Sequence, residues 1–418
     1  MNRVYLCIDL KTFYASVECV ERGLDPYKTD LIVADPSRCN GAICLAISPH
    51  MKERGIKNRC RVWEIPKNVH PIVAKPRMKL YIQYSAKIYS IYLKYISKDD
   101  IHPYSIDEMF LDVTDYLKLY NKTPIEMAKM LMNEIYINTG ISSAAGIGTN
   151  LYLTKVALDI LAKHEPNHIA YLDEELYKEK LWHHLPITDF WRISYGTESR
   201  LHKLHLKDMY DIAHADKNKL YKEFGINAEY LIDHAFGIEP TTIADIKKYK
   251  PKSNSLSNSQ ILYEDYNYKK AKIVLIEMID NLLLQLIKLN YYTHGVSFYI
   301  GYSKDRIPPV KASFKLEQPT CNFNIITKKV LTEYDYRINE EVPIRKLGIS
   351  FFNIGPRKFE QIDLFTSYES LELDNKLDGI INNIKDKYGK NSILRATSYL
   401  EGATARDRNK LIGGHNAE

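Results

Sequence analysis

Short apolar runs alternate with helical spacing through the first 170 residues of the chain. Unbroken apolar runs predict strands, and apolar positions that recur every three or four residues predict helices with one buried face. The expected strands are 4–8, 31–34, 43–47, 103–113 with a central turn, and 143–147, and the expected helices begin near 12 and cover 123–137 and 151–163. Strands that alternate with helices predict an α/β core for residues 1 to about 170.

The pattern changes twice in the rest of the chain. Residues 171–240 are helical in pattern, and a charged stretch that becomes rich in Ser and Asn then predicts a linker at 241–259. An amphipathic helix at 271–289 and strands with alternating apolar residues predict an α+β domain with one polar sheet face. The alternating apolar positions are Val296, Phe298, Ile300, Ala312, Phe314, Leu316, Leu347, Ile349 and Phe351. The last 50 residues are polar and helical in pattern.

Composition indicates an ordinary globular protein with several domains. The chain has 418 residues, of which 45% are apolar and 26% are charged. Its net charge of +6 is compatible with a polyanionic partner, although many cytosolic proteins carry a similar charge. The six cysteines form no CxxC pair and no zinc-like cluster with histidine, which favours a reduced, cytoplasmic compartment. We find no secretion signal and no apolar stretch long enough for a membrane span, so no membrane partner is expected.

Three acidic residues stand at the ends of predicted strands. Asp9 follows the first strand, and Asp107 and Glu108 lie in the turn of the strand–turn–strand unit. If the two strands are neighbours, the carboxylates converge, and like charges this close require a compensating cation. Phosphoryl transfer uses such a site, because two Mg²⁺ ions held by carboxylates can bridge the attacking and leaving oxygens. The alternative is a set of solvated acids at turns, although an aspartate flanked by apolar residues fits that explanation less well.

The residues around these acids resemble the motifs of the Y-family DNA polymerases, which copy damaged DNA. Segment 7–18, CIDLKTFYASVE, resembles the opening motif D-x-x-x-F-[YF]-A-x-V/C-E, and segment 105–108, SIDE, resembles the second carboxylate motif. The similarity extends over residues 1 to about 365, and the tail resembles the bacterial SOS branch that contains the catalytic subunit of polymerase V. The resemblance implies a DNA-directed DNA polymerase for translesion synthesis in DNA repair. It also implies two Mg²⁺ ions, held by Asp9, Asp107, Glu108 and the backbone carbonyl of Leu10.

The same resemblance assigns residues to the incoming nucleotide. Tyr14 follows Phe13 and is expected to pack under the sugar and exclude a 2′-hydroxyl, and both aromatics are expected to contact the dNTP. Lys52 and Lys163 are expected to contact the triphosphate. Lys52 stands where relatives have Arg, and it keeps the charge without the bidentate geometry. Segment 146–150, GIGTN, followed by Lys155 and Lys163, resembles a further motif of the family, and Lys163 aligns with it only after one inserted residue near Leu161. The ordinary alternatives are core aromatics and solvated lysines.

The expected fold is a right-hand polymerase that combines α/β and α+β domains. The resemblance predicts a palm, fingers, a small thumb like a helix-hairpin-helix, a linker, a little finger, and a tail that begins with a clamp-binding peptide. The expected boundaries are 1–12 and 80–170 (palm), 13–79 (fingers), 171–240 (thumb), 241–259 (linker), 260–357 (little finger) and 358–418 (peptide and tail). Only one Gly remains in the thumb turn at 190–197, which weakens the prediction of phosphate binding there. Charged residues of the little finger would follow the DNA backbone, namely Lys304, Arg306, Lys311 and Lys315.

The expected partners are primer–template DNA, dNTPs and a bacterial sliding clamp, and an accessory subunit or a recombinase filament is left open. Segment 361–365, QIDLF, fits the clamp-peptide pattern Q-x-x-L-F, in which Gln361 sets the register and Leu364 and Phe365 enter a pocket. One rival function is a two-metal nuclease or nucleotidyl cyclase on a similar palm, against which the aromatic gate and the little finger argue. The other is a non-catalytic factor that binds DNA and the clamp, against which the three acids argue.

Overall fold

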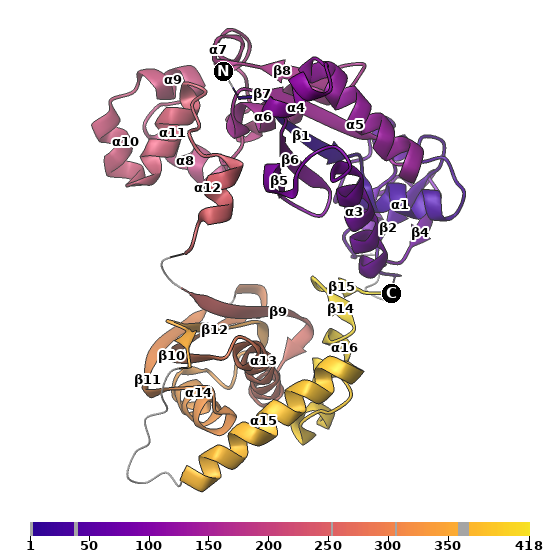
Figure 1. The fold of residues 1–418 in the computed structure, drawn as a ribbon. Coiled ribbons are helices and arrows are strands. Elements are labelled where there is room, and N and C mark those ends of the chain that lie inside the picture. Colours follow the sequence, from indigo (N-terminus) through magenta and orange to yellow (C-terminus); the bar gives the residue numbers. More distant parts are fainter. Residues whose placement is uncertain (1–2, 37–40, 252–253, 306, 358–367) are drawn as a thin grey trace. The chain divides into compact units, whose positions relative to one another are not determined.

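The computed structural model describes residues 3–36, 41–251, 254–305, 307–357 and 368–418 (Figure 1). The chain divides into a first unit, residues 1–249 with 415–418, and a second unit, residues 250–414. Each unit has its own sheet and its own hydrophobic core.

The main sheet of the first unit has five strands, with β1 (Tyr5–Leu10) in the centre. Their order is β5 (Ile101–Pro103), β6 (Glu108–Asp112), β1, β7 (Ser143–Gly148) and β8 (Ile169–Leu172). Each neighbouring pair is antiparallel except β7 and β8, which are parallel. The apolar sequence of β1 suits a strand that is paired on both edges and buried. Its central position brings the end of β1 next to the beginning of β6.

Helices of the first unit pack on this sheet and on one another. They are α3 (Met78–Tyr92), η3 (Lys98–Asp100), α4 (Thr114–Leu119), α5 (Pro124–Thr139), α6 (Leu151–Val156) and η4 (Ala157–Ala162). The sheet face that carries Cys7 and Phe110 packs against α6 and η4 in one core. The helix approaches β7 so closely that a Cβ atom on Gly146 would lie 2.1 Å from the carbonyl oxygen of Thr154. The absence of a side chain at Gly146 therefore allows the helix that carries Lys155 to pack closely against the sheet.

A smaller three-stranded sheet follows the first helix of the chain. The strands of this sheet and the helices beside them in the chain are α1 (Phe13–Glu21), β2 (Leu31–Val33), β3 (Ala46–Ile47), α2 (Pro49–Glu53), η2 (Val62–Glu64) and β4 (Ile72–Ala74). The strand order is β3, β2, β4, and the fully buried side chains of Ile32, Ile47 and Met51 contribute to a small core of its own.

The end of the first unit is a group of short helices. They are α7 (Glu174–Leu181), η5 (Ile187–Asp189), α8 (Tyr195–Lys203), α9 (Met209–His214), α10 (Lys217–Phe224), α11 (Asn227–Ala235) and α12 (Ile243–Lys248). Their apolar faces share one core with α6 and the main sheet. Residues 415–418, which contain β15 (His415–Asn416), also belong to this unit, and the Lys79 amide donates to the Ala417 carbonyl at 3.0 Å.

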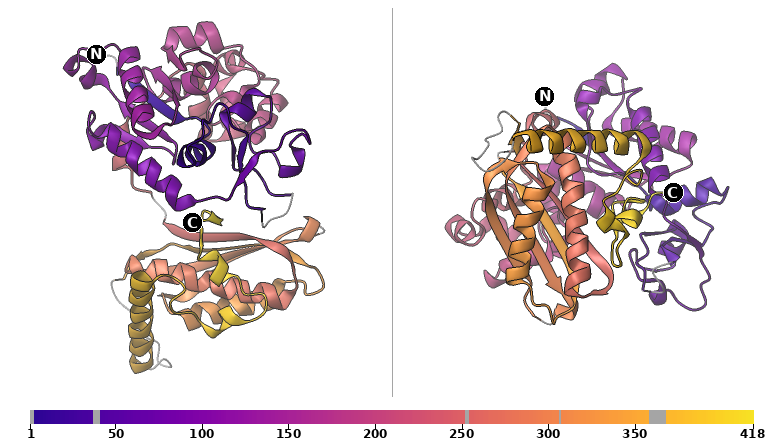
Figure 2. Two further views of the ribbon diagram at one scale, coloured as in Figure 1. Left: turned by 90° about the vertical axis from the view of Figure 1, so that its right-hand side faces the viewer. Right: turned by 90° about the horizontal axis from the view of Figure 1, so that it is seen from below.

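The second unit is an antiparallel sheet with helices on one face (Figure 2). The strand order is β11 (Val310–Thr320), β10 (Tyr291–Tyr302), β12 (Ile344–Phe352), β9 (Ser255–Tyr266), and β13 (Gly355–Pro356) pairs with β10. The helices and turns are α13 (Tyr268–Lys288), η6 (Ser303–Asp305), α14 (Phe323–Arg337), α15 (Tyr368–Tyr388), η7 (Ala396–Tyr399) and α16 (Ala405–Arg408), followed by β14 (Leu411–Ile412). The alternating apolar residues of the strands face the helices, as the pattern predicted.

The structure corrects two expectations about local structure. The stretch 241–259 contains the boundary between the two units, but α12 and the first residues of β9 occupy much of it. Ser255, Ser257 and Ser259 are exposed on the outer face of β9, so the polar composition there belongs to a solvated sheet face. The expected helix 151–163 is α-helical only as far as Val156, and a π-helical turn follows.

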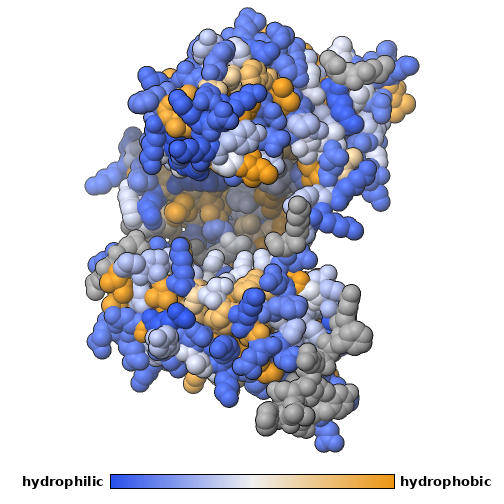
Figure 3. Space-filling view, turned by 90° about the vertical axis from the view of Figure 1, so that its left-hand side faces the viewer, coloured by the Kyte–Doolittle hydropathy of each residue, from blue (hydrophilic) through white to orange (hydrophobic). Residues whose placement is uncertain are grey.

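Hydrophilic residues cover most of the face seen in Figure 3, with apolar residues scattered among them. Across the described ranges, no helix has the length and apolar character that a membrane crossing requires.

Candidate active site

The end of β1 and the beginning of β6 bring the three predicted acids together. Asp9 and Glu108 are direct partners in the antiparallel register, and the Leu10 amide donates to the Asp107 carbonyl at 2.9 Å. Directly opposed residues of antiparallel strands present their side chains on the same face of the sheet. The carboxylates of Asp9 and Glu108 therefore share one face, and Asp107 lies in the turn beside them.

Glu108 is buried and fully engaged. Its Oε1 atom accepts from the Cys7 thiol at 2.9 Å, and its two oxygens lie 2.8 Å and 2.9 Å from the Lys155 ammonium. Burial and the neighbouring Glu108 charge raise the pKa of Cys7 well above its usual range, so this thiol remains protonated and donates. Lys155 thus supplies the positive charge that a buried carboxylate requires.

Asp9 is less well compensated. Burial raises its pKa to about 7, Lys163 opposes the rise, and the nearby charges of Asp107 and Glu108 add to it. Asp107 is only half-buried, and its Oδ1 accepts from the Ser105 hydroxyl at 2.6 Å. The group carries more negative charge than its lysines neutralise, which suits the binding of a further cation.

The donor chemistry fits Mg²⁺, which prefers carboxylate oxygens and retains several waters. Among the described residues, no three side chains of the Asp, Glu, His or Cys type lie close enough to share an ion. At this site both oxygens of Glu108 bind Lys155. Asp9, Asp107 and Glu108 would hold a divalent cation once Glu108 turned away from that lysine.

The sequence predicted no role for Lys155 or Asp159, although Lys155 contacts Glu108 and Asp159 contacts Lys155. Asp159 Oδ2 is 2.9 Å from Lys155, and Asp159 Oδ1 is 2.9 Å from Lys163. The three residues follow one another at intervals of four, which is the spacing that could have revealed them. Lys163 was predicted, and it lies close enough to Asp9 to lower the pKa of that carboxyl. The residue inserted near Leu161 is absorbed by the π-helical turn.

Tyr14 lies on an aromatic platform. Its ring stacks on Tyr81 with centroids 4.5 Å apart and planes 19° from parallel, while Phe13 is buried in the core. Tyr81 is itself fixed, because its hydroxyl donates to the buried Glu18 at 2.7 Å and Arg77 also binds that carboxylate. The final Glu of the opening motif therefore orients the ring beneath Tyr14. Burial and the charge of Asp107 raise the pKa of Tyr14, which agrees with its place beside the acids.

Lys52 lies on α2 with an exposed side chain. The positive charge of Lys52 acts on Lys11: burial lowers the pKa of Lys11 to about 8, and the Lys52 charge adds to this fall. Two like charges that approach each other in this way attract an anion. Lys11, directly after the strand that ends with Asp9 and Leu10, was missed because nothing in its spacing set it apart.

The predicted phosphate-binding turn of the helical region contains an arginine in a left-handed conformation. Arg192 has φ of 70°, and its guanidinium lies 5.0 Å from the Trp191 ring centroid and 5.3 Å from that of Tyr230. The Trp191 indole donates to the Tyr104 hydroxyl at 3.0 Å. The turn is therefore joined to the hairpin that carries the acids, and a charged side chain occupies a position that Gly adopts more easily.

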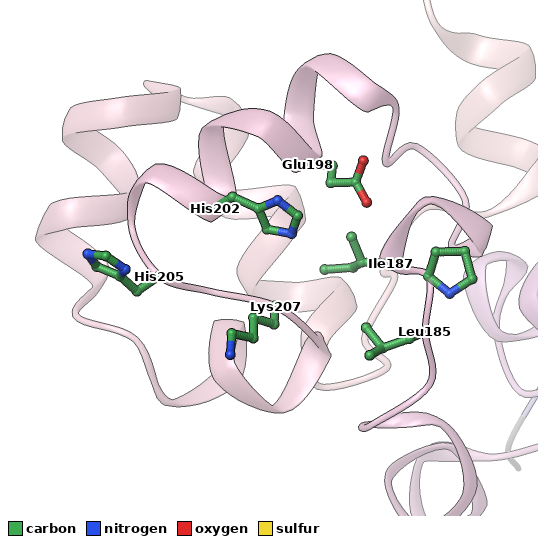
Figure 4. A pocket seen from close by; sticks show the side chains of 7 residues that line it. Leu185, Ile187, Glu198, His202, His205 and Lys207 are labelled. Atoms are coloured by element: carbon green, nitrogen blue, oxygen red, sulfur yellow. The ribbon is translucent and has the colours of Figure 1, made fainter.

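A surface pocket of about 560 Å³ lies among the same short helices (Figure 4). Glu198 and His202 line it from one face of α8, whereas His205 points away from the other side chains (Figure 4). This pocket is separate from the acids of β1 and β6, and its polar groups do not converge on a common point.

Two of the predicted little-finger cations, Lys311 and Lys315, are exposed on β11. Lys304 is exposed in η6. Arg306 and the clamp-peptide residues Gln361, Leu364 and Phe365 lie outside the described residues.

Comparisons with known proteins identify the family of the chain and its fold. Residues 8–159 match the model of the impB/mucB/samB family, and residues 253–364 match its C-terminal domain. The chain is 32% identical to the UV-damage repair protein UvrX of Bacillus subtilis, over 99% of the chain and 97% of the relative. It is 29% identical to DNA polymerase IV 2 of the same organism, over 99% of both. A solved Y-family DNA polymerase chimera has the same fold, with a TM-score of 0.66 and 20% identity over 84% of this chain and 99% of the chimera.

Proposed function

Because the chain belongs to the impB/mucB/samB family of Y-family DNA polymerases, we propose that it extends a primer across damaged template bases by two-metal nucleotidyl transfer from dNTPs. The observation that carries the proposal is the register of β1 and β6, which sets Asp9 opposite Glu108 and Asp107 beside them. A purely structural role gives no reason to place the largely buried Asp9 and Glu108 opposite each other, because neighbouring buried acids are costly.

The residues of this chain would divide the work as follows. Asp9, Asp107, Glu108 and the Leu10 carbonyl would hold two Mg²⁺ ions, which neutralise the triphosphate and activate the primer hydroxyl. Lys163 and Lys52 would contact the triphosphate. The Tyr14 ring, supported by Tyr81, would lie under the sugar, with Phe13 behind it.

Primer extension on matched templates tests this function. One template carries a single abasic site or photodimer, and its control has the undamaged base. We expect nucleotide incorporation on both the damaged and the undamaged template. Incorporation should require Mg²⁺, follow the template where a base is present, and stop when the metal is chelated. Degradation of the primer without extension would favour a nuclease, and DNA binding without either reaction would favour a non-catalytic factor.

We further propose that the segment 361–365 binds a bacterial sliding clamp. A mildly basic protein with few phosphate contacts releases DNA readily at physiological salt, and a tether to a clamp raises its local concentration on DNA. Leu364 and Phe365 are the apolar anchors, and Gln361 sets their register.

Replacing both Leu364 and Phe365 by Ala should weaken clamp binding by at least about 30-fold, because buried apolar anchors carry most of the affinity of a short peptide. Calorimetric titration against a purified bacterial clamp measures this change. Extension without the clamp should remain at the wild-type rate, whereas stimulation by the clamp should disappear. Unchanged binding by the double variant would remove the clamp from the set of partners.

A further inference from the structure

Lys155 is a buried cation whose hydrogen-bonding capacity is completely used. Its side chain is 9% exposed, and its ammonium lies within 2.9 Å of both oxygens of Glu108 and of Asp159 Oδ2. An ammonium has three donors and no acceptor, so three carboxylate oxygens satisfy it fully. Lys155 therefore connects a proposed metal ligand, Glu108, to a carboxylate that none of the motifs includes.

Asp159 is held from both sides along its helix. One oxygen binds Lys155 and the other binds Lys163, each across a spacing of four residues. Since each oxygen has its own lysine, the carboxylate cannot rotate without losing a contact. The side chain of Asp159 is 26% exposed, so part of it stays hydrated while the side facing Lys155 is enclosed.

The pairing of Glu108 with Lys155 conflicts with the proposed role of Glu108. To bind a cation, Glu108 must turn its oxygens away, and Lys155 then loses two of its three partners. A buried ammonium without a carboxylate partner is strongly unfavourable. Asp159 is the charged partner that Lys155 would keep, so its presence lowers the free-energy cost of releasing Glu108.

We propose that Asp159 is a positioning residue that keeps Lys155 paired when Glu108 turns from this lysine to a divalent cation. The inference rests on the proposed polymerase function and deepens it. Lys155 acts as an internal counter-ion for Glu108 before the cation enters, and Asp159 acts on the reaction only through Lys155. Lys163 fixes the orientation of Asp159.

The test measures the Mg²⁺ concentration that half-saturates dNTP binding. The primer ends in a 3′-dideoxynucleotide, so no bond can form. The fluorescence of a template base then reports binding of the complementary dNTP to the enzyme–DNA complex. Asp159→Asn removes the charge and retains the shape, and it should raise the half-saturating Mg²⁺ concentration about fivefold or more, since Lys155 then holds Glu108 more firmly. The variant Asp159→Glu retains the charge, so its half-saturating Mg²⁺ concentration should stay within about twofold of the wild-type value.

A second variant should move the same quantity in the opposite direction. Lys155→Met removes the competitor for Glu108 and leaves the acids with less positive charge around them, so the half-saturating Mg²⁺ concentration should fall at least about threefold. Structural damage would weaken binding in both variants, whereas the proposal requires opposite shifts. If melting curves show that Lys155→Met does not fold, the test of the proposal is the difference in half-saturating Mg²⁺ concentration between Asp159→Asn and Asp159→Glu.

Glu333→Gln is the matched control. Glu333 also joins two cations at intervals of four, Lys329 and Arg337, but on α14 of the second unit. It should leave the Mg²⁺ dependence unchanged. An Asp159→Asn value within about twofold of wild type, or shifts of Asp159→Asn and Lys155→Met in the same direction, would overturn the inference. Wild-type enzyme that binds no dNTP under template control would instead contradict the polymerase function itself.

Discussion

Replacement of Asp107 by Ala is expected to reduce dNTP incorporation by about 10³-fold or more, which corresponds to a loss of about 4 kcal/mol of transition-state stabilisation. Asp107 lies in the turn next to Asp9 and Glu108, and its loss would remove one of the three carboxylates that we propose as ligands of the metal ions. Single-turnover primer extension at saturating dNTP and Mg²⁺ measures the change.

DNA binding and folding should survive this substitution. Asp107 is only half-buried and accepts a hydrogen bond from the neighbouring Ser105, so its removal leaves no unpaired buried charge. Primer–template affinity should stay within about threefold of wild type, because phosphate contacts dominate it. Asp115→Ala, an exposed Asp on α4 of the same unit, is the control and should extend normally. Extension by the Asp107 variant at a near wild-type rate would exclude this residue from the metal site.

The sequence predicted the acids but no role for the lysine that pairs with Glu108. Asp9, Asp107 and Glu108 could be found because each lies at the end of a strand, where one strand pairing is enough to bring them together. Lys155 contacts Glu108 from 47 positions further along the chain, and no local pattern connects the two. To identify Lys155 as the partner of Glu108 requires the packing of α6 against β7, which depends on the absence of a side chain at Gly146.

Composition was a poor guide to the junction between the two units. The chain does divide after residue 249, within the predicted linker, but the Ser- and Asn-rich residues that follow form the start of β9. Leu256 packs against the core there, while the serines on either side face solvent. A strand whose outer face carries small polar residues has the same composition as a linker, so composition alone does not distinguish the two. In a similar way, the alignment revealed one extra residue near Leu161, but only helix packing determines that a π-helical turn absorbs it.

Tyr14→Ala is expected to lower the preference for dNTPs over rNTPs by about 100-fold, because steric exclusion of one hydroxyl is worth roughly that factor. The Tyr14 ring stacks on Tyr81 at 4.5 Å, and Glu18 anchors Tyr81, so the ring cannot move aside to admit a larger sugar. The ratio of kcat/KM for a dNTP and for the matching rNTP, measured opposite the same template base, gives the change.

Tyr14→Phe separates the ring from its hydroxyl. If discrimination is steric, Phe keeps the ring and the stacking on Tyr81, and the dNTP preference should stay within about threefold of wild type. The Ala variant should gain activity with rNTPs, whereas a variant that was merely unstable would lose activity with both nucleotides. An unchanged preference in Tyr14→Ala would mean that Tyr14 is a packing residue of α1, and that another side chain excludes the 2′-hydroxyl.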